Sequence, residues 1–133
     1  MGRVRLLLDT HVLLWAVLEP GKLPPGLVTL LEDPACELLV SAASAWEMAT
    51  KWRIGKLSGA TQVVKNYGRA LDGLGARELP ISSKEALQAG RWKVEHRDPF
   101  DRLLAAQALL LDLDLASTDF AFTQFEGVRV HCA

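Results

Sequence analysis

Val4-Arg5-Leu6-Leu7-Leu8-Asp9 is a short apolar run that ends in a single acid. A continuous run of this length is typical of a strand buried on both faces, as in a parallel sheet. The following segment, Thr10 to Leu18, has the pattern of a helix, and Glu19-Pro20-Gly21 ends it. A buried strand followed at once by a helix favours an α/β fold.

The rest of the chain repeats this alternation. Further strands are expected at 37–41, 77–81, 115–117 and 128–130, and further helices at about 24–32, 42–54, 60–74, 83–91 and 99–112. Alternating strands and helices imply a parallel sheet with helices on both faces. Because no repeat or long linker divides the chain, residues 1–133 are expected to form a single domain.

Composition limits the classes of function. The hydrophobic fraction of 50% argues against disorder, and the net charge of −1 shows that the chain is not globally basic. A nucleic-acid partner would therefore be held by a local basic face or through a metal ion. A nearly neutral, apolar-rich chain also favours a dimer or a tight protein partner.

The two cysteines, Cys36 and Cys132, form no CxxC motif, so a disulfide framework is not expected. This usage suits a reducing compartment, and the apolar run after Arg5 is too short to span a membrane. We therefore expect a cytoplasmic protein.

Four acids lie where segments change character: Asp9, Glu47, Asp101 and Asp119. If the strands run parallel, these acids can gather at one edge of the sheet. Gathered carboxylates raise one another's pKa unless a cation bridges them, and oxygen ligands suit Mg²⁺ or Mn²⁺. The pattern predicts metal-assisted chemistry on phosphates.

Each acid also has an ordinary structural interpretation. Asp9 and Asp119 could cap the turns that follow them, and Glu47 could form an exposed helical ion pair with Lys51. Asp98 has the sequence position of a helix N-cap, which makes Asp101 a first-turn acid. The helix after Asp101 is apolar nearly all round, however, so its carboxylate is expected at the mouth of a buried layer.

Taken together, the segments that contain these acids resemble the PIN-domain ribonucleases, in particular the VapC-like toxins of bacterial type II toxin–antitoxin modules. The resemblance covers nearly the whole chain, and the segment that begins at His96 is the most specific part of it. The matching segments are Leu6-Leu7-Leu8-Asp9-Thr10-His11, Ser44-Ala45-Trp46-Glu47, His96-Arg97-Asp98-Pro99-Phe100-Asp101-Arg102-Leu103-Leu104-Ala105-Ala106-Gln107-Ala108 and Ser117-Thr118-Asp119.

This resemblance implies a three-layer α/β/α sandwich with a central parallel sheet (PIN-like). It also implies a Mg²⁺- or Mn²⁺-dependent endoribonuclease that forms a homodimer and is controlled by a cognate antitoxin. Thr10 and Thr118 match polar positions that support such a site. Carried over position by position, the catalytic and metal-binding acids are Asp9, Glu47, Asp101 and Asp119.

An RNA substrate needs cations and stacking surfaces. Phosphate contacts are predicted for Lys51, Arg53, Lys56, His96, Arg97 and Arg102, although such side chains are more often simply solvated. Bases could stack on Trp15, Trp46, Trp52 and Trp92, for which packing in the core or an interface is the more common use.

Two other classes stay open. A receiver-like phosphoacceptor would need a pair of adjacent acids, whereas Asp9 is followed by Thr10 and His11, and the same His11 disfavours a DxD phosphatase. A catalytically silent binding module would use the four acids only as caps and surface charge. Metal dependence separates this class from an enzyme. Nucleotide-binding glycine loops and a GxSxG elbow do not occur in the sequence.

Overall fold

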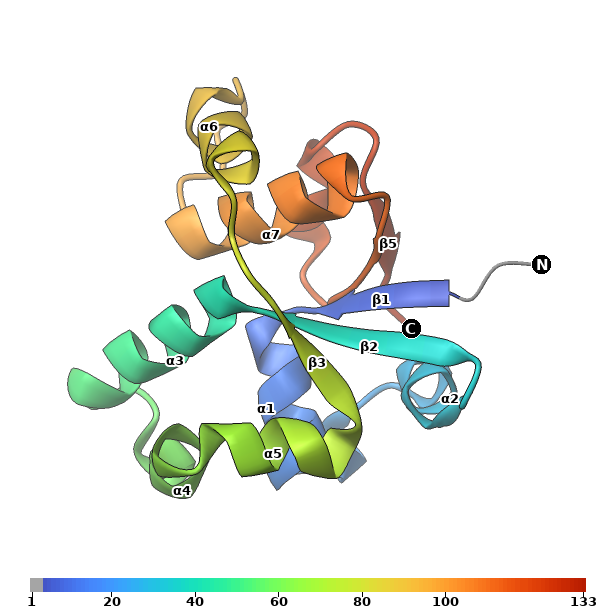
Figure 1. Ribbon diagram of the computed structural model, residues 1–133, viewed down its shortest axis with the longest axis vertical. Coiled ribbons are helices and arrows are strands. Elements are labelled where there is room, and N and C mark those ends of the chain that lie inside the picture. Colours follow the sequence, from blue (N-terminus) through green and yellow to red (C-terminus); the bar gives the residue numbers. More distant parts are fainter. Residues whose placement is uncertain (1–3) are drawn as a thin grey trace.

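The computed structural model describes residues 4–133 and has one sheet of five parallel strands in the order β3-β2-β1-β4-β5 (Figure 1). The strands are β1 (Val4–Leu8), β2 (Cys36–Ser41), β3 (Ala76–Leu79), β4 (Asp114–Ala116) and β5 (Arg129–His131). The predicted parallel sheet is confirmed, and each strand lies within two residues of its expected position.

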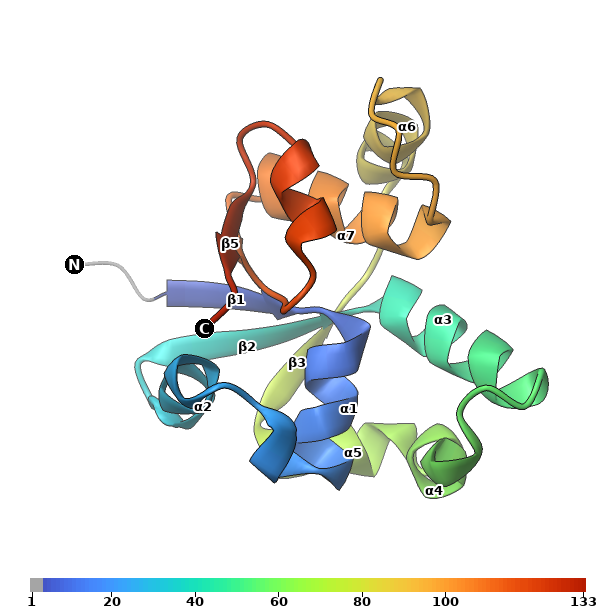
Figure 2. The same ribbon diagram turned by 180° about the vertical axis from the view of Figure 1, so that it is seen from behind.

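Helices cover both faces of the sheet, as expected for an α/β/α sandwich. Figures 1 and 2 show α1, α2, α4 and α5 on one face and α6 and α7 on the other, while α3 extends from the sheet's edge. The helices are α1 (Thr10–Leu18), α2 (Pro25–Glu32), α3 (Ala42–Arg53), α4 (Thr61–Lys65), α5 (Tyr67–Leu74), α6 (Ser83–Arg91) and α7 (Pro99–Leu110), with 3-10 turns η1 (Pro20–Lys22), η2 (Ser58–Ala60) and η3 (Phe120–Gln124).

The side chains of β1 show why the sheet is central. Leu6 and Leu8 belong to the core under α1, α2 and α5, whereas Leu7 belongs to the core under α7. All three side chains are completely buried. Alternating apolar residues of a single strand therefore supply both cores, as the continuous apolar run predicted.

The prediction of one helix over 60–74 was wrong, because the helix is broken at Asn66. The backbone there leaves the helical region (φ −125°, ψ 45°), which separates α4 from α5. The Asn66 side-chain amide donates to the carbonyl of Gln62 at 3.3 Å. The same carbonyl still accepts from Asn66 N at 2.9 Å, so the side chain adds a local bond without displacing a helical one. Asparagine has a low helix propensity because its side chain can bond to nearby backbone in other conformations, so the break falls at a residue that tolerates it.

Two other element ends differ from the prediction. Strand β3 stops at Leu79, before Pro80, which has no N–H to donate to a ladder. Helix α7 stops at Leu110, and Asp112 then adopts a left-handed conformation with φ 55°. These residues turn the chain into β4, which begins at Asp114.

The order of the strands indicates which edge of the sheet could hold a functional site. The chain passes from β1 outward to β2 and β3, and then returns to β4 on the other side of β1. Ligands of open parallel sheets bind at such a switch point, outside the carboxyl ends of the strands. Asp9 follows β1 there, and Ser117 follows β4.

None of the helices within residues 4–133 has the length and apolar character needed to cross a membrane.

Candidate functional site

Asp9 lies between β1 and α1, in the N-cap position, with extended backbone angles of −61° and 150°. Its carboxylate makes no capping hydrogen bond; it accepts instead from Ser117 Oγ at 2.7 Å. The residue is only 4% exposed. Burial raises the pKa of Asp9, the Ser117 hydrogen bond opposes that rise, and the negative charge of Glu47 adds to it. Asp9 is therefore a buried acid whose side chain does not cap α1.

Ser117 joins two acids of the site. While its hydroxyl donates to Asp9, its oxygen accepts from the backbone N–H of Asp119 at 3.0 Å. Ser117 is fully buried, whereas Thr118, for which a supporting role was predicted, is partly exposed. Sequence reasoning missed Ser117; a small hydroxyl residue at the end of the strand beside β1 was the available signal.

Thr10 and α3 hold the second buried acid. Helix α3 begins directly after β2, where Ser41 caps it by accepting from Ala43 N at 3.0 Å. One turn later Glu47 is 2% exposed, and its Oε1 accepts from Thr10 Oγ1 at 2.6 Å. Thr10 Oγ1 also lies 2.9 Å from Ser44 Oγ. The predicted supporting position of Thr10 thus contacts a predicted ligand directly.

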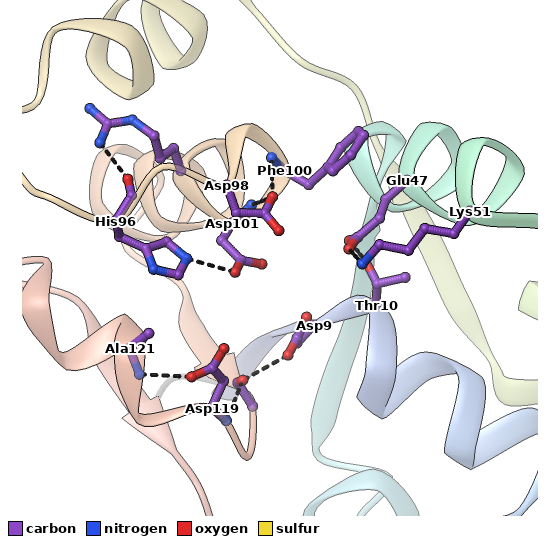
Figure 3. A network of polar contacts seen from close by, with 12 residues as sticks. Asp9, Thr10, Glu47, Lys51, His96, Asp98, Phe100, Asp101, Asp119 and Ala121 are labelled. Carbon is purple, nitrogen blue, oxygen red and sulfur yellow. Dashed lines mark hydrogen bonds and ion pairs between the residues drawn. The ribbon is translucent and has the colours of Figure 1, made fainter. Parts of the chain in front are cut away.

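Lys51 forms the expected ion pair with Glu47, but the pair is not an exposed one. Lys51 Nζ contacts Glu47 Oε2, and the two side chains are 27% and 2% exposed. Burial alone would lower the pKa of Lys51, but the bond to Glu47 and the charges of Asp98 and Asp101 raise it. Figure 3 shows this ammonium beside Thr10 and Glu47.

Asp101 lies across from Glu47, in the first turn of α7. Its Oδ2 is 2.8 Å from His96 Nε2, and the residue is 9% exposed. Burial raises the pKa of Asp101 to about 7; the hydrogen bond from His96 opposes the rise, and the charges of Asp98, Asp9 and Glu47 add to it. The expectation that clustered acids raise one another's pKa is confirmed for Asp9 and Asp101.

Asp98 is the N-cap that the sequence predicted. Its Oδ1 accepts from Phe100 N at 2.9 Å and from Asp101 N at 3.3 Å. This cap fixes the first turn of α7, and so it fixes where Asp101 points.

Asp119 differs from the other three acids because it is exposed. Its Oδ1 accepts from Ala121 N at 2.9 Å and so caps η3. Figure 3 places Asp119 at the border of the site, and its backbone N–H is linked to Asp9 through the hydroxyl of Ser117. The structure thus gathers three buried acids, Asp9, Glu47 and Asp101, with Asp119 at their edge.

The predicted cations divide into two kinds. Arg53, Lys56 and Arg97 have exposed side chains. Arg102 points into the protein, where its guanidinium donates to the carbonyls of Ala89 (2.7 Å), Val94 (3.0 Å), His96 (2.8 Å) and Trp92. Most of its donors are thus engaged with the loop that carries His96, which leaves little of the guanidinium for a phosphate.

The tryptophan side chains differ in whether they pack inside the protein or are exposed. Trp92 packs edge-on against Phe125 at 4.8 Å between ring centroids, and Trp52 Nε1 donates to Thr61 Oγ1 at 3.0 Å. Trp46 is 56% exposed, with an edge contact to Phe100 at 4.7 Å. Of these three, only Trp46 offers an open ring close to the acids.

A divalent cation suits this site by charge and by the chemistry of its donors. Within residues 4–133, no three acidic, histidine or cysteine side chains are arranged so that they could jointly hold a metal ion. Mg²⁺ keeps several of its waters, however, and needs few direct carboxylates. The three buried carboxylates repel one another, and a bound cation would reduce this repulsion. The residues therefore fit such an ion, and the two best placed to hold it are Asp9, after β1, and Asp101, in the first turn of α7.

A comparison with known protein families gives a match over most of the chain. Residues 6–128 match the family described as PIN domain. The match covers nearly the entire chain and includes all four predicted acids. A comparison of the sequence with curated proteins gives no significant match.

Solved structures show the same fold. VapBC2 from Rickettsia felis, bound to a DNA fragment from its promoter, is similar with a TM-score of 0.68 and 15% identity, covering 96% of this chain and 98% of that one. VapBC-1 from nontypeable Haemophilus influenzae gives 0.64 and 17%, covering 96% and 97%. FitAcB from Neisseria gonorrhoeae gives 0.61 and 22%, covering 94% and 95%.

Proposed function

Because the chain belongs to the PIN-domain family, whose members are generally nucleases, we propose that it is a Mg²⁺- or Mn²⁺-dependent endoribonuclease and the toxin of a toxin–antitoxin pair. The observation that carries the proposal is that Asp9, after β1, Glu47, on α3, and Asp101, on α7, lie near one another at the carboxyl edge of the sheet. Their burial and the raised pKa of Asp9 and Asp101 favour a site for a cation over ordinary surface charge.

The residues have separate roles in this proposal. A divalent ion would lower the pKa of an attacking water and offset charge on the leaving oxygen of the phosphodiester. Asp9 and Asp101 would contact the ion directly, whereas Glu47 and Asp119 would act directly or through water. Ser117 and Thr10 hold the carboxylates of Asp9 and Glu47 in place.

The basic side chains near the site would contact phosphates of the RNA backbone. Arg53 and Lys56 lie at and beyond the end of α3, and Arg97 lies in the loop before α7. Lys51 lies closest to the acids, since it contacts Glu47. Phosphate contacts of this kind position a nucleic acid without reading its sequence.

The toxin assignment rests on the sequence resemblance to VapC-like proteins, and the fold shared with VapBC and FitAcB structures is consistent with it. A cytoplasmic nuclease of this kind would need an antitoxin that blocks the acids. Exposed apolar side chains such as Leu87, at 64%, and Leu110, at 45%, support a protein interface, and we propose a homodimer.

The decisive experiment is RNA cleavage by the purified protein in Mg²⁺, in Mn²⁺ and in chelator, with Asp9→Asn and Asp101→Asn as variants. Cleavage should require metal and fall steeply in both variants, while thermal unfolding shows that they stay folded. A silent binding module or a phosphoacceptor would give no metal-dependent cleavage. Equal cleavage in chelator and in Mg²⁺ would refute the nuclease proposal.

The toxin role has its own test in cells. Expression of the chain alone should slow growth, and co-expression with the neighbouring small gene should restore growth and yield a stable complex. Asp9→Asn should remove toxicity without preventing the complex. Harmless expression of the wild type, with no neighbour-encoded partner bound, would refute the toxin role even if cleavage is observed.

A further inference from the structure

Lys51 holds its positive charge inside the group of acids. Its ammonium contacts Glu47 Oε2, while Glu47 Oε1 accepts from Thr10 Oγ1 at 2.6 Å. Each oxygen of this carboxylate therefore already has a donor from the protein. With Glu47 only 2% exposed, water does not compete for these bonds as it would on an open helix surface.

The surroundings of Lys51 explain why a cation is held there. Glu47 lies opposite Asp101 and beside Asp9, so three buried carboxylates face one region (Figure 3). Arg102, the nearby guanidinium on α7, directs its donors to the carbonyls of the preceding loop. On the α3 side, the positive charge in direct contact with an acid is therefore that of Lys51, on Glu47, while on the α7 side His96 contacts Asp101 at 2.8 Å.

We propose that Lys51 is the resident counter-ion of the acid group and competes with the divalent cation for Glu47. The inference rests on the proposed metal-dependent function. Two consequences of opposite sign follow: Lys51 stabilises the metal-free protein, and it weakens metal binding. Once displaced, its ammonium would be free to contact a substrate phosphate.

The test compares Lys51→Met with the wild type by calorimetric titration of Mn²⁺ into chelator-stripped protein and by thermal unfolding without metal. Methionine keeps most of the length of the side chain, one heavy atom short of lysine, and removes its charge. The dissociation constant for Mn²⁺ should fall about fivefold or more, the size of an ordinary coupling between two ligands. The unfolding temperature of the metal-free variant should fall at the same time.

Three further variants make the test specific. Lys65→Met, at an exposed position at the end of α4, removes the same charge away from the acids and should leave the Mn²⁺ constant unchanged. Lys51→Gln keeps a donor for Glu47 without the charge, and should also tighten Mn²⁺ if Lys51→Met does not fold. In a Glu47→Gln background, Lys51→Met should lose most of its effect.

The results separate this inference from the proposed function. If the wild type binds Mn²⁺ and Lys51→Met and Lys51→Gln bind it equally or more weakly, Lys51 is only a structural ion pair and the inference is wrong. If the wild type binds no divalent ion and cleaves no RNA, the proposed function itself is wrong.

Discussion

Ser117 Oγ donates a hydrogen bond to Asp9 Oδ2 at 2.7 Å, joining residues that are 108 positions apart in the sequence. The two residues directly follow neighbouring strands, β4 and β1, on either side of the switch point. The same hydroxyl oxygen accepts from Asp119 N at 3.0 Å. One small side chain therefore sets the distance between the central acid and the turn that carries the exposed one.

Ser117→Ala should weaken both the fold and the site. A buried carboxylate loses its donor, which should cost about 1–3 kcal/mol of unfolding free energy. The pKa of Asp9 should rise further, because the Ser117 hydrogen bond opposes its increase. Urea unfolding and Mn²⁺ titration would measure both effects. Thr118→Ala, at the partly exposed neighbouring position, is the matched control, and a larger loss there would contradict the role given to Ser117.

Substitutions at Asp98 and Asp101 should distinguish a helix cap from a metal ligand. Asp98→Ser keeps an N-cap acceptor and should retain most cleavage, with a stability change below about 1 kcal/mol. Asp101→Ser removes a proposed ligand and should abolish cleavage with little loss of stability. Cleavage measured beside thermal unfolding decides the matter, and the reverse pattern would move the ligand role to Asp98.

The contribution of Asp101 to the stability of the metal-free protein should fall as pH rises. Burial raises the pKa of Asp101 from 3.8 to about 7, so the folded state keeps this proton where the unfolded chain has lost it. The contribution of Asp101 is therefore most favourable below about pH 4, declines up to about pH 7 and levels off above it. Urea unfolding in chelator across this range would show the slope. Asp101→Asn should flatten it, and equal slopes in both proteins would contradict the assignment.

Arg102 should act by holding the loop that carries His96. Its guanidinium donates to the carbonyls of Ala89, Trp92, Val94 and His96, so Arg102→Ala should cost at least about 2 kcal/mol of unfolding free energy. Arg102→Lys should restore only part of that loss, since an ammonium cannot reach the same fan of carbonyls. Arg97→Ala, at an exposed position of the same loop, should stay within about 0.5 kcal/mol of the wild type. Similar losses at Arg97 and Arg102, measured by urea unfolding, would show that loop charge alone matters.

The sequence by itself determined the elements whose signals are local. The apolar run of β1 predicted a strand buried on both faces, and Asp98-Pro99 predicted where α7 begins. The four acids were found because each lies at a boundary between segments, and boundaries are marked by neighbouring residues. The break at Asn66 was missed because the apolar periodicity continues across it, and a single asparagine is only a weak signal against a helix.

Only the tertiary structure decided which side chains meet. Asp9, in an ordinary capping position, bonds instead to Ser117 from the far end of the chain, and Arg102, a predicted phosphate contact, binds the carbonyls of a loop. Lys51 and Glu47 are separated by one helical turn, as in many exposed pairs, but the packing of α3 against α1 and α7 buries Glu47 and partly buries Lys51 among acids. Local sequence specifies backbone conformation, whereas burial and partners depend on residues brought together from distant parts of the chain.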